Sequence, residues 1–198
     1  MRNVAVVIFN DVEVLDFCGP FEVFSVAGGH GEDGVFQVYT VAEIKRPICT
    51  RGGLSVNPAY TLEDCPAPDI VVVPGGRGTR REKDNPILLQ WIRRMSDSAE
   101  IILSVCSGSL VLANAGLLEG LAATTHHNTM DLLHELAPHS RICPDQRLVD
   151  NGRVITSAGI AAGIDAALHI VARLLGQAKA EATAWHMEYK WVNNGVYS

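Results

Sequence analysis

The feature that most constrains the fold of this chain is a series of short apolar runs rich in β-branched residues. Several of them contain no polar residue, as expected of strands in a parallel sheet that is covered on both faces. Helical patterns separate the runs along the chain. The expected strands are Val4–Phe9, Phe36–Val41, Ile70–Val73, Ile101–Ser104, Ala122–Thr125 and Val154–Thr156.

Local sequence marks the ends of the helices and the turns. Asn85 followed by Pro86 is a cap with proline at the first helical position, and Gly116 is a typical helix stop. Turn residues predict one hairpin around Asp150–Arg153 and a second within Ile48–Val56. The expected helices are Phe21–Val26, Pro86–Met95, Ser109–Ala115, Met130–Leu136, Ile164–Leu175 and Lys179–Glu188.

The order of these elements predicts an open, doubly wound, mostly parallel α/β sheet with helices on both faces. Functional sites in such sheets lie at the carboxyl ends of the strands. The chain has 198 residues, and we find no internal repeat or linker in it. We therefore expect residues 1–198 to form a single domain.

Composition excludes several kinds of partner. The net charge is −6, and acidic residues dilute the densest basic stretch, so neither nucleic acid nor an anionic membrane is an expected partner. No apolar stretch approaches the length of a bilayer. The five cysteines are an odd number with no CxxC pair, which predicts reduced thiols in a cytoplasmic protein rather than a disulfide framework.

One cysteine stands where a buried strand changes abruptly into a helix. The apolar run Ile101–Val105 ends at Cys106, and small residues, Ser104 and Gly108, flank it. This pattern is typical of a nucleophile elbow, a tight strand–turn–helix turn that lifts the side chain above the sheet. The turn places the thiol at a helix N-terminus, where we expect the thiolate, the nucleophilic form, to be favoured. The alternative is a buried structural cysteine.

Asp16 follows the first expected strand, so it too belongs to the carboxyl edge of the sheet. A carboxyl among Leu15, Phe17 and Phe21 would be partly desolvated, which raises its pKa and suits it to proton transfer. The alternative is a helix N-cap ahead of Gly19-Pro20.

Backbone and hydroxyl groups at the same edge are candidates for holding a developing anion. Gly75 and Gly76 follow the strand Ile70–Val73, and their N–H groups, with that of Ser107, can point into a cleft. The alternative for the glycines is a flexible turn. The Ser107 hydroxyl either binds substrate or caps the helix that starts there.

His126 and His127 come directly after the expected strand Ala122–Thr125. One of them is a candidate acid or base beside Cys106. His134 and His139 lie nearby in sequence, but there is neither an HExxH motif nor a CxxC pair, and no metal site is predicted.

Ordered motifs along nearly the whole chain resemble the DJ-1/PfpI (ThiJ) superfamily, and within it most closely the isonitrile hydratase-like branch. A second resemblance is to the amidotransferase-like N-terminal domains of some AraC-type regulators. The 198 residues hold no helix-turn-helix domain, so we do not expect direct transcriptional control. The motifs are Val14-Leu15-Asp16-x-x-Gly19-Pro20-x-Glu22-Val23-Phe24, Pro74-Gly75-Gly76, Val105-Cys106-x-Gly108, Leu112-Ala113-x-Ala115-Gly116-Leu117-Leu118-x-Gly120-x-x-Ala123-Thr124-Thr125-His126 and Ser157-Ala158-Gly159-Ile160-x-Ala162-Gly163-Ile164-Asp165.

The resemblance implies a flavodoxin-like fold and a homodimer. Cys106 matches the family nucleophile, Asp16 the acid beside it, and His126 a histidine near the thiol in the DJ-1 branch. Protease-like and chaperone-like branches carry His directly after the cysteine, where this chain has Ser107, which disfavours amidase or peptidase activity. Isonitrile hydratase carries Thr there, so the hydroxyl is kept.

We therefore predict a lyase that needs no cofactor and hydrates an isonitrile, a small-molecule substrate, to an N-substituted formamide. In this hypothesis Cys106 forms a thioimidate, Asp16 acts as acid and base, and Gly75, Gly76 and Ser107 hold the intermediate. One alternative is a glyoxalase or deglycase that uses Cys106, Asp16 and His126 on reactive carbonyls. A non-enzymatic alternative is a redox-sensing or stress-response protein that acts through oxidation of Cys106.

Overall fold

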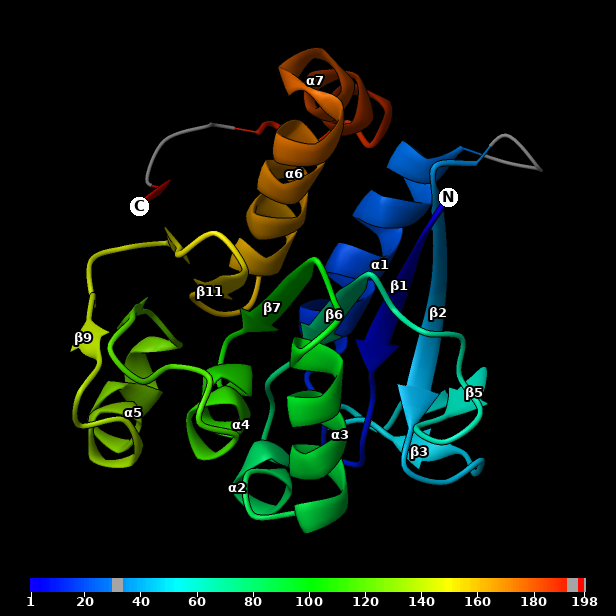
Figure 1. Ribbon diagram of the computed structural model, residues 1–198. Helices are drawn as coiled ribbons and strands as arrows, with labels where there is room; N and C mark the ends of the chain where they lie inside the picture. Colours follow the sequence, from blue (N-terminus) through cyan, green and yellow to red (C-terminus); the bar gives the residue numbers. More distant parts are fainter. Residues whose placement is uncertain (30–33, 192–195, 198) are drawn as a thin grey trace.

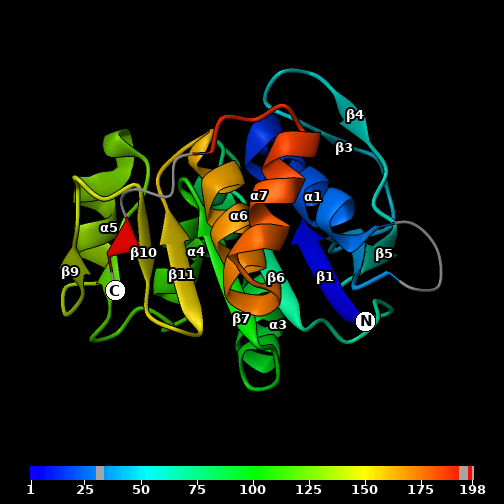
Figure 2. The ribbon, with the colours of Figure 1, turned by 90° about the horizontal axis from the view of Figure 1, so that it is seen from above.

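The computed structural model describes residues 1–29, 34–191 and 196–197. An eight-stranded sheet forms its centre (Figures 1 and 2). Neighbouring strands are parallel except for β10 and β11, which form an antiparallel pair. In spatial order the strands are β12 (Val196–Tyr197), β10 (Leu148–Asp150), β11 (Val154–Ser157), β7 (Ile101–Val105), β6 (Ile70–Val73), β1 (Arg2–Val7), β2 (Phe36–Ala42) and β5 (Tyr60–Thr61).

Helices form two layers, one on each face of the sheet (Figures 1 and 2). The first layer holds α1 (Val14–Gly28), α6 (Ala162–Leu175) and α7 (Gln177–His186); the second holds α2 (Thr79–Glu82), α3 (Pro86–Ser96) and α4 (Gly108–Asn114). Every residue of β6 and β7 is buried between the layers. Continuous apolar strands lie in the middle because both of their faces meet helices. The expected doubly wound α/β fold is confirmed.

Five inner strands follow the order β2-β1-β6-β7-β11. This order is that of flavodoxin-like sheets, in which the chain reverses direction of winding between the first and third strands. Here that switch point lies between β1 and β6. A crevice outside the carboxyl ends of β1, β6 and β7 is thus the place where the fold itself favours a ligand.

Two expectations about local structure are wrong. The first helix begins at Val14 rather than Phe21, so it contains both Asp16 and Pro20. Its N-cap is Glu13, whose side chain makes no capping bond, so Asp16 does not cap this helix. Pro20 is accommodated in the second turn, where the missing N–H leaves only the Asp16 carbonyl without its usual helical donor.

The expected strand Ala122–Thr125 is shorter and does not belong to the main sheet. Only Ala122–Ala123 is strand, as β8, and it pairs with β9 (Arg141–Ile142) in a separate two-stranded sheet. Thr124 instead donates its backbone N–H to the Thr156 hydroxyl at 2.9 Å, which ties this segment to β11. The short η1 (His127–Thr129) and α5 (Met130–Leu136) follow it.

Other local predictions are confirmed. The hairpin within Ile48–Val56 forms β3 (Ile48–Cys49) and β4 (Ser55–Val56), and β10 and β11 form the second hairpin. The Asn85 side chain accepts from the Ile87 and Leu88 N–H groups at the start of α3. No helix in the described part of the chain is long and apolar enough to cross a membrane.

Gly108, the first residue of α4, packs directly on the end of β6. A Cβ there would overlap the Val73 carbonyl oxygen and lie 2.9 Å from the Pro74 carbonyl oxygen. We expect Gly108→Ala to lower the free energy of unfolding by about 2 kcal/mol or more, because backbone rather than a flexible side chain must move. Urea denaturation measures this change.

Gly52→Ala is the matched control, because a Cβ at Gly52 meets nothing within 4 Å. We expect it to change stability by less than about 0.5 kcal/mol. Equal stability of the two variants would contradict the close packing assigned to Gly108.

Candidate active site

The turn after β7 holds Cys106 in a backbone conformation that residues other than glycine rarely adopt. Its φ is 56°, in the left-handed region. The Cys106 N–H donates to the carbonyl oxygens of Ser157 at 3.1 Å and Ala158 at 3.3 Å. Its carbonyl accepts the Thr125 hydroxyl at 2.8 Å. These bonds fix the turn, so the sharp elbow expected at Cys106 is present.

Gly159 leaves the space that the thiol needs. A Cβ at Gly159 would lie 2.9 Å from the Cys106 sulfur and would also overlap the edge of the His126 ring. Any side chain at Gly159 would therefore displace one of the two groups. The imidazole and the thiol thus both lie against Gly159, in the loop after β11, and no hydrogen bond joins them in the described residues.

Asp16 lies fully buried in the first turn of α1. Its Oδ2 accepts the Gly75 N–H at 3.0 Å. Its Oδ1 is buried and has no partner at hydrogen-bond geometry among the described residues. The Cys106 thiol nevertheless interacts with this carboxyl closely enough to shift its pKa.

Burial raises the pKa of Asp16 to about 7, although hydrogen bonding to Cys106 and to the Gly75 N–H acts in the opposite direction. The Glu13 charge raises the pKa of Asp16 a little further. Burial, the negative charge of Asp16 and hydrogen bonding to Asp16 raise the pKa of the Cys106 thiol to about 12, against weaker lowering by Ser107. Between those two values the pair holds one proton and one negative charge.

The expected preference for the thiolate is therefore wrong for this resting structure. Cys106 is only 7% exposed, and α4 has just seven residues. Desolvation and the neighbouring carboxylate outweigh what the N-terminus of so short a helix contributes. The thiol is instead the proton donor of a buried acid pair.

The Ser107 hydroxyl binds neighbouring groups rather than capping α4. Ser107 occupies the N-cap position without a side-chain capping bond. Its Oγ accepts the Gly76 N–H at 3.1 Å, contacts the Gly76 carbonyl oxygen at 3.2 Å, and lies 3.0 Å from the Thr79 hydroxyl. The N–H groups of Gly75 and Gly76 are thus occupied in this conformation, and the backbone of Ser107 acts to lower the pKa of the Cys106 thiol.

His126 faces the same pocket as Cys106. Its Nδ1 accepts the Asn128 N–H at 3.2 Å, which is the acceptor role of a neutral ring. Burial, His127 and Arg80 lower the pKa of His126, so the ring is neutral at physiological pH. No described cluster of three His, Cys, Asp or Glu side chains is arranged to hold a metal ion.

A pocket of about 310 Å³ opens over the thiol. The residues at its base are candidates that the sequence indicates, whereas its charged rim is not predicted. Arg77 adjoins Gly76 and Arg80 is the second residue of α2, so their places near the site follow from that loop. Arg51 comes from the β3–β4 hairpin, and no local pattern indicates it. The pocket is lined by Glu13, Arg51, Gly76, Arg77, Arg80, Cys106, Ser107, His126, Asn128, Thr129 and Ile160.

The fold and this site define an α/β protein in which an elbow presents a cysteine beside a buried acid at the switch point of the sheet. The chain belongs to the DJ-1/PfpI family, whose model matches residues 2–173.

Three individual proteins illustrate what this chain is similar to. Isonitrile hydratase of Pseudomonas putida is 37% identical over 187 residues, which cover 94% of this chain and 78% of that protein. The crystal structure of a ThiJ/PfpI family protein from Pseudomonas syringae has a TM-score of 0.86 at 32% identity and covers 96% of this chain and 75% of that one. The HTH-type transcriptional regulator CdhR of Pseudomonas aeruginosa is 31% identical over 163 residues, covering 82% of this chain and 48% of the regulator.

Replacement of Asp16 should change how stability depends on pH. The pKa of Asp16 is about 7 in the folded protein against 3.8 for a free side chain, so the folded state holds more protons between these values. The free energy of unfolding of the wild type therefore falls as pH rises through this range and levels off above it. Asp16→Asn lacks this dependence, and we expect it to gain stability relative to the wild type from about pH 4 to about pH 7.

Urea denaturation across this pH range gives the difference between the two proteins. Asp97→Asn removes an exposed carboxyl and serves as the control, which should follow the wild type. A difference that stays flat with pH would show that Asp16 does not carry the raised pKa.

Proposed function

We propose that this protein is a cysteine-dependent hydratase that converts isonitriles and water into N-substituted formamides. The observation that carries the proposal is the buried Asp16–Cys106 pair, which shares one proton under a small pocket with no histidine next in sequence to the cysteine. The match to isonitrile hydratase over 94% of the chain supports the same reaction class.

The first step uses the proton of the pair. Ionised Asp16 accepts the proton of the Cys106 thiol as the sulfur attacks the terminal carbon of the isonitrile. Asp16 then delivers that proton to the same carbon. The product is a thioimidate, in which the sulfur is bonded to a carbon that carries one hydrogen and is doubly bonded to nitrogen.

The second step uses water. Asp16 takes a proton from water as the oxygen attacks the thioimidate carbon, and passes that proton to the nitrogen. The carbon–sulfur bond of the resulting tetrahedral intermediate then breaks as Asp16 takes the remaining proton of the hydroxyl group and the carbonyl forms. The formamide leaves, and Asp16 returns this second proton to the Cys106 sulfur.

Groups around the sulfur hold the reacting atoms in this scheme. The N–H of Ser107, whose backbone already acts to lower the pKa of the Cys106 thiol, is the donor that holds the developing charge. Gly75 positions Asp16 through its N–H, and Gly76 positions the Ser107 hydroxyl. These three residues thereby fix the relative positions of the Asp16 carboxyl, the Cys106 sulfur and the Ser107 N–H.

Turnover of a small alkyl isonitrile, followed as formamide by NMR, tests the proposal. We expect Cys106→Ala to abolish formamide production and Asp16→Asn to lower kcat/KM by about 100-fold or more, because it removes the proton carrier. In the wild type, kcat/KM should rise as pH increases through about 7, where Asp16 ionises.

Cys18→Ala is the matched control, since Cys18 is a partly buried thiol on the same helix as Asp16. It should retain turnover. Formamide formation that persists in Cys106→Ala, or a complete lack of it in the wild type, would overturn the proposal.

A glyoxalase or deglycase on reactive carbonyls is the second candidate, and the position of His126 favours it. The neutral imidazole lines the pocket with Cys106, where it can move a proton on a bound carbonyl compound. We expect methylglyoxal consumption, if this is the function, to be lost in His126→Gln. His127→Gln is the control, because His127 is exposed and does not line the pocket. Consumption that does not depend on His126 would contradict this candidate.

The raised pKa of Cys106 disfavours the redox-sensing alternative, because sensor cysteines react as accessible thiolates. We further propose a single-domain homodimer in the cytoplasm. Trp185, 81% exposed on α7, is an apolar side chain that a subunit interface would bury.

A further inference from the structure

Three arginines line the pocket over Cys106, and two of them have no acidic partner in the part of the chain that the structure describes. Arg51 pairs at 2.7 Å with Glu13, which is the one carboxylate among the described residues that line the pocket. Among the described residues no carboxylate pairs with Arg77 or Arg80. Even with one negative charge on the Asp16–Cys106 pair, the pocket carries a net positive charge.

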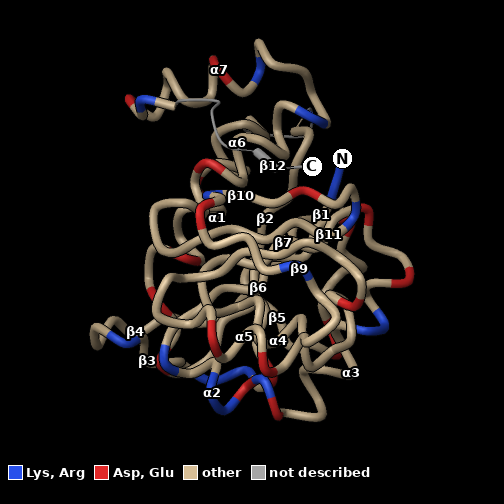
Figure 3. The backbone as a smooth tube through the Cα atoms, turned by 90° about the vertical axis from the view of Figure 1, so that its left-hand side faces the viewer, with Lys and Arg blue, Asp and Glu red and all other residues tan. Residues whose placement is uncertain are grey.

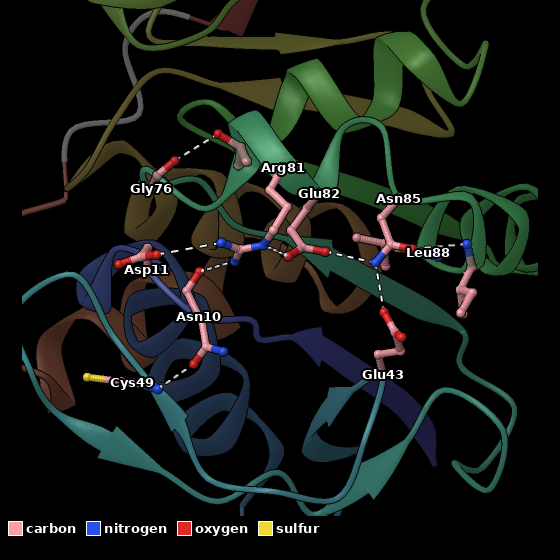
Figure 4. A network of polar contacts seen from close by, with 11 residues as sticks. Asn10, Asp11, Glu43, Cys49, Gly76, Arg81, Glu82, Asn85 and Leu88 are labelled. Atoms are coloured by element: carbon pink, nitrogen blue, oxygen red, sulfur yellow. Dashed lines mark hydrogen bonds and ion pairs between the residues drawn. The ribbon is translucent and has the colours of Figure 1, made fainter.

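The neighbouring Arg81, in contrast, has carboxylate and carbonyl partners for its guanidinium. Arg81 lies 2.9 Å from the Glu82 carboxylate and 3.7 Å from that of Asp11, and it donates to the Asn10 carbonyl at 3.0 Å (Figure 4). Arg81 is therefore neutralised outside the pocket over Cys106. Arg80, on the same short segment, donates to the Thr79 hydroxyl at 3.3 Å, and neither Arg77 nor Arg80 has a carboxylate partner among the described residues. Both can therefore bind an anionic group that comes from outside the chain.

The segment that carries these arginines is held from several sides. Asn85 donates to both Glu82 and Glu43, which connects the end of α2 to the segment after β2 (Figure 4). Thr79 donates to the Gly76 carbonyl at 2.7 Å. Such a fixed support reduces the ordering cost of binding an anion between the arginines.

The positive pocket contrasts with the rest of the molecule. The whole chain has a net charge of −6, with 22 acidic and 16 basic residues. Figure 3 shows basic residues gathered along α2, with acidic residues beside them. Unpaired arginines in a cleft of an acidic protein concentrate anions there, whereas a neutral isonitrile alone gives them nothing to bind.

We propose that the substrate of the Cys106 site carries a small anionic group, of which a carboxylate is the simplest, that binds Arg77 and Arg80. In terms of the proposed function, the substrate class is then a carboxylated isonitrile, and this part of the inference rests on that function. The pocket volume of about 310 Å³ fits a small molecule that reaches from the arginines to the sulfur. Arg51, paired with Glu13, closes another side of the same pocket.

Alkylation of Cys106 tests the anion site without requiring any turnover. In both reagents the Cys106 sulfur displaces iodide, forming a carbon–sulfur bond as the carbon–iodine bond breaks. Iodoacetate carries a carboxylate, and iodoacetamide is its neutral counterpart of nearly equal size. The rate ratio of the two, measured by mass spectrometry of the peptide that contains Cys106, cancels any change in thiol pKa between variants.

We expect the iodoacetate to iodoacetamide ratio to fall about tenfold in Arg77→Gln/Arg80→Gln relative to the wild type. The ratio of the wild type should also fall in about 0.5 M salt, because salt screens the attraction. Arg46→Gln/Arg94→Gln removes the same charge from exposed positions outside the pocket and should keep the wild-type ratio. An unchanged ratio in Arg77→Gln/Arg80→Gln would overturn the proposal.

Formamide production from isocyanoacetate and from its methyl ester then separates the two proposals. A higher kcat/KM for isocyanoacetate that depends on Arg77 and Arg80 supports the carboxylated substrate. Equal use of both compounds would contradict the anionic substrate while the hydratase function stands. If neither compound is hydrated but the alkylation ratio still depends on the arginines, the anion site stands and the hydratase function fails.

Discussion

The close contact between the start of α4 and the end of β6 sets the geometry on which the rest of the site depends. Because Gly108 has no side chain, the helix begins directly against the Val73 carbonyl. The chain must therefore turn within one residue, and Cys106 takes up the left-handed conformation that results. This turn places the thiol beside Asp16, which lies in α1 after β1, on the far side of β6 from β7.

The two ends of the pocket are different environments: the base is desolvated, and the rim is exposed and positively charged. At its base, desolvation raises the pKa values of Asp16 and Cys106 and keeps a proton between them. At its rim, Arg77 and Arg80 are exposed and positively charged. A molecule with a negative end and a neutral reactive end would satisfy both regions, because only its neutral end has to enter the desolvated base.

The parts of this structure that local sequence determines could be predicted, and the parts that tertiary contacts determine could not. The buried strands and the elbow at Cys106 follow from short apolar runs and small residues. The sequence predicts too late a start for α1, because Gly19-Pro20 is typical of a helix beginning. This helix instead accommodates Pro20 in its second turn. The protonation state of the Cys106 thiol could not be predicted either, because it depends on how deeply Asp16 and Cys106 are buried together.

The absence of a side chain at Gly75 has a consequence for how this family can vary. The space of a Cβ at Gly75 is bounded by the Ser107 N at 2.6 Å, the Ser107 Oγ at 2.7 Å and the Asp16 Oδ2 at 2.8 Å. Positions 16, 75 and 107 therefore share one small volume, although they come from three distant parts of the chain. During evolution, a longer acid at position 16 requires the other two positions to move or change with it, so the three should covary as a unit.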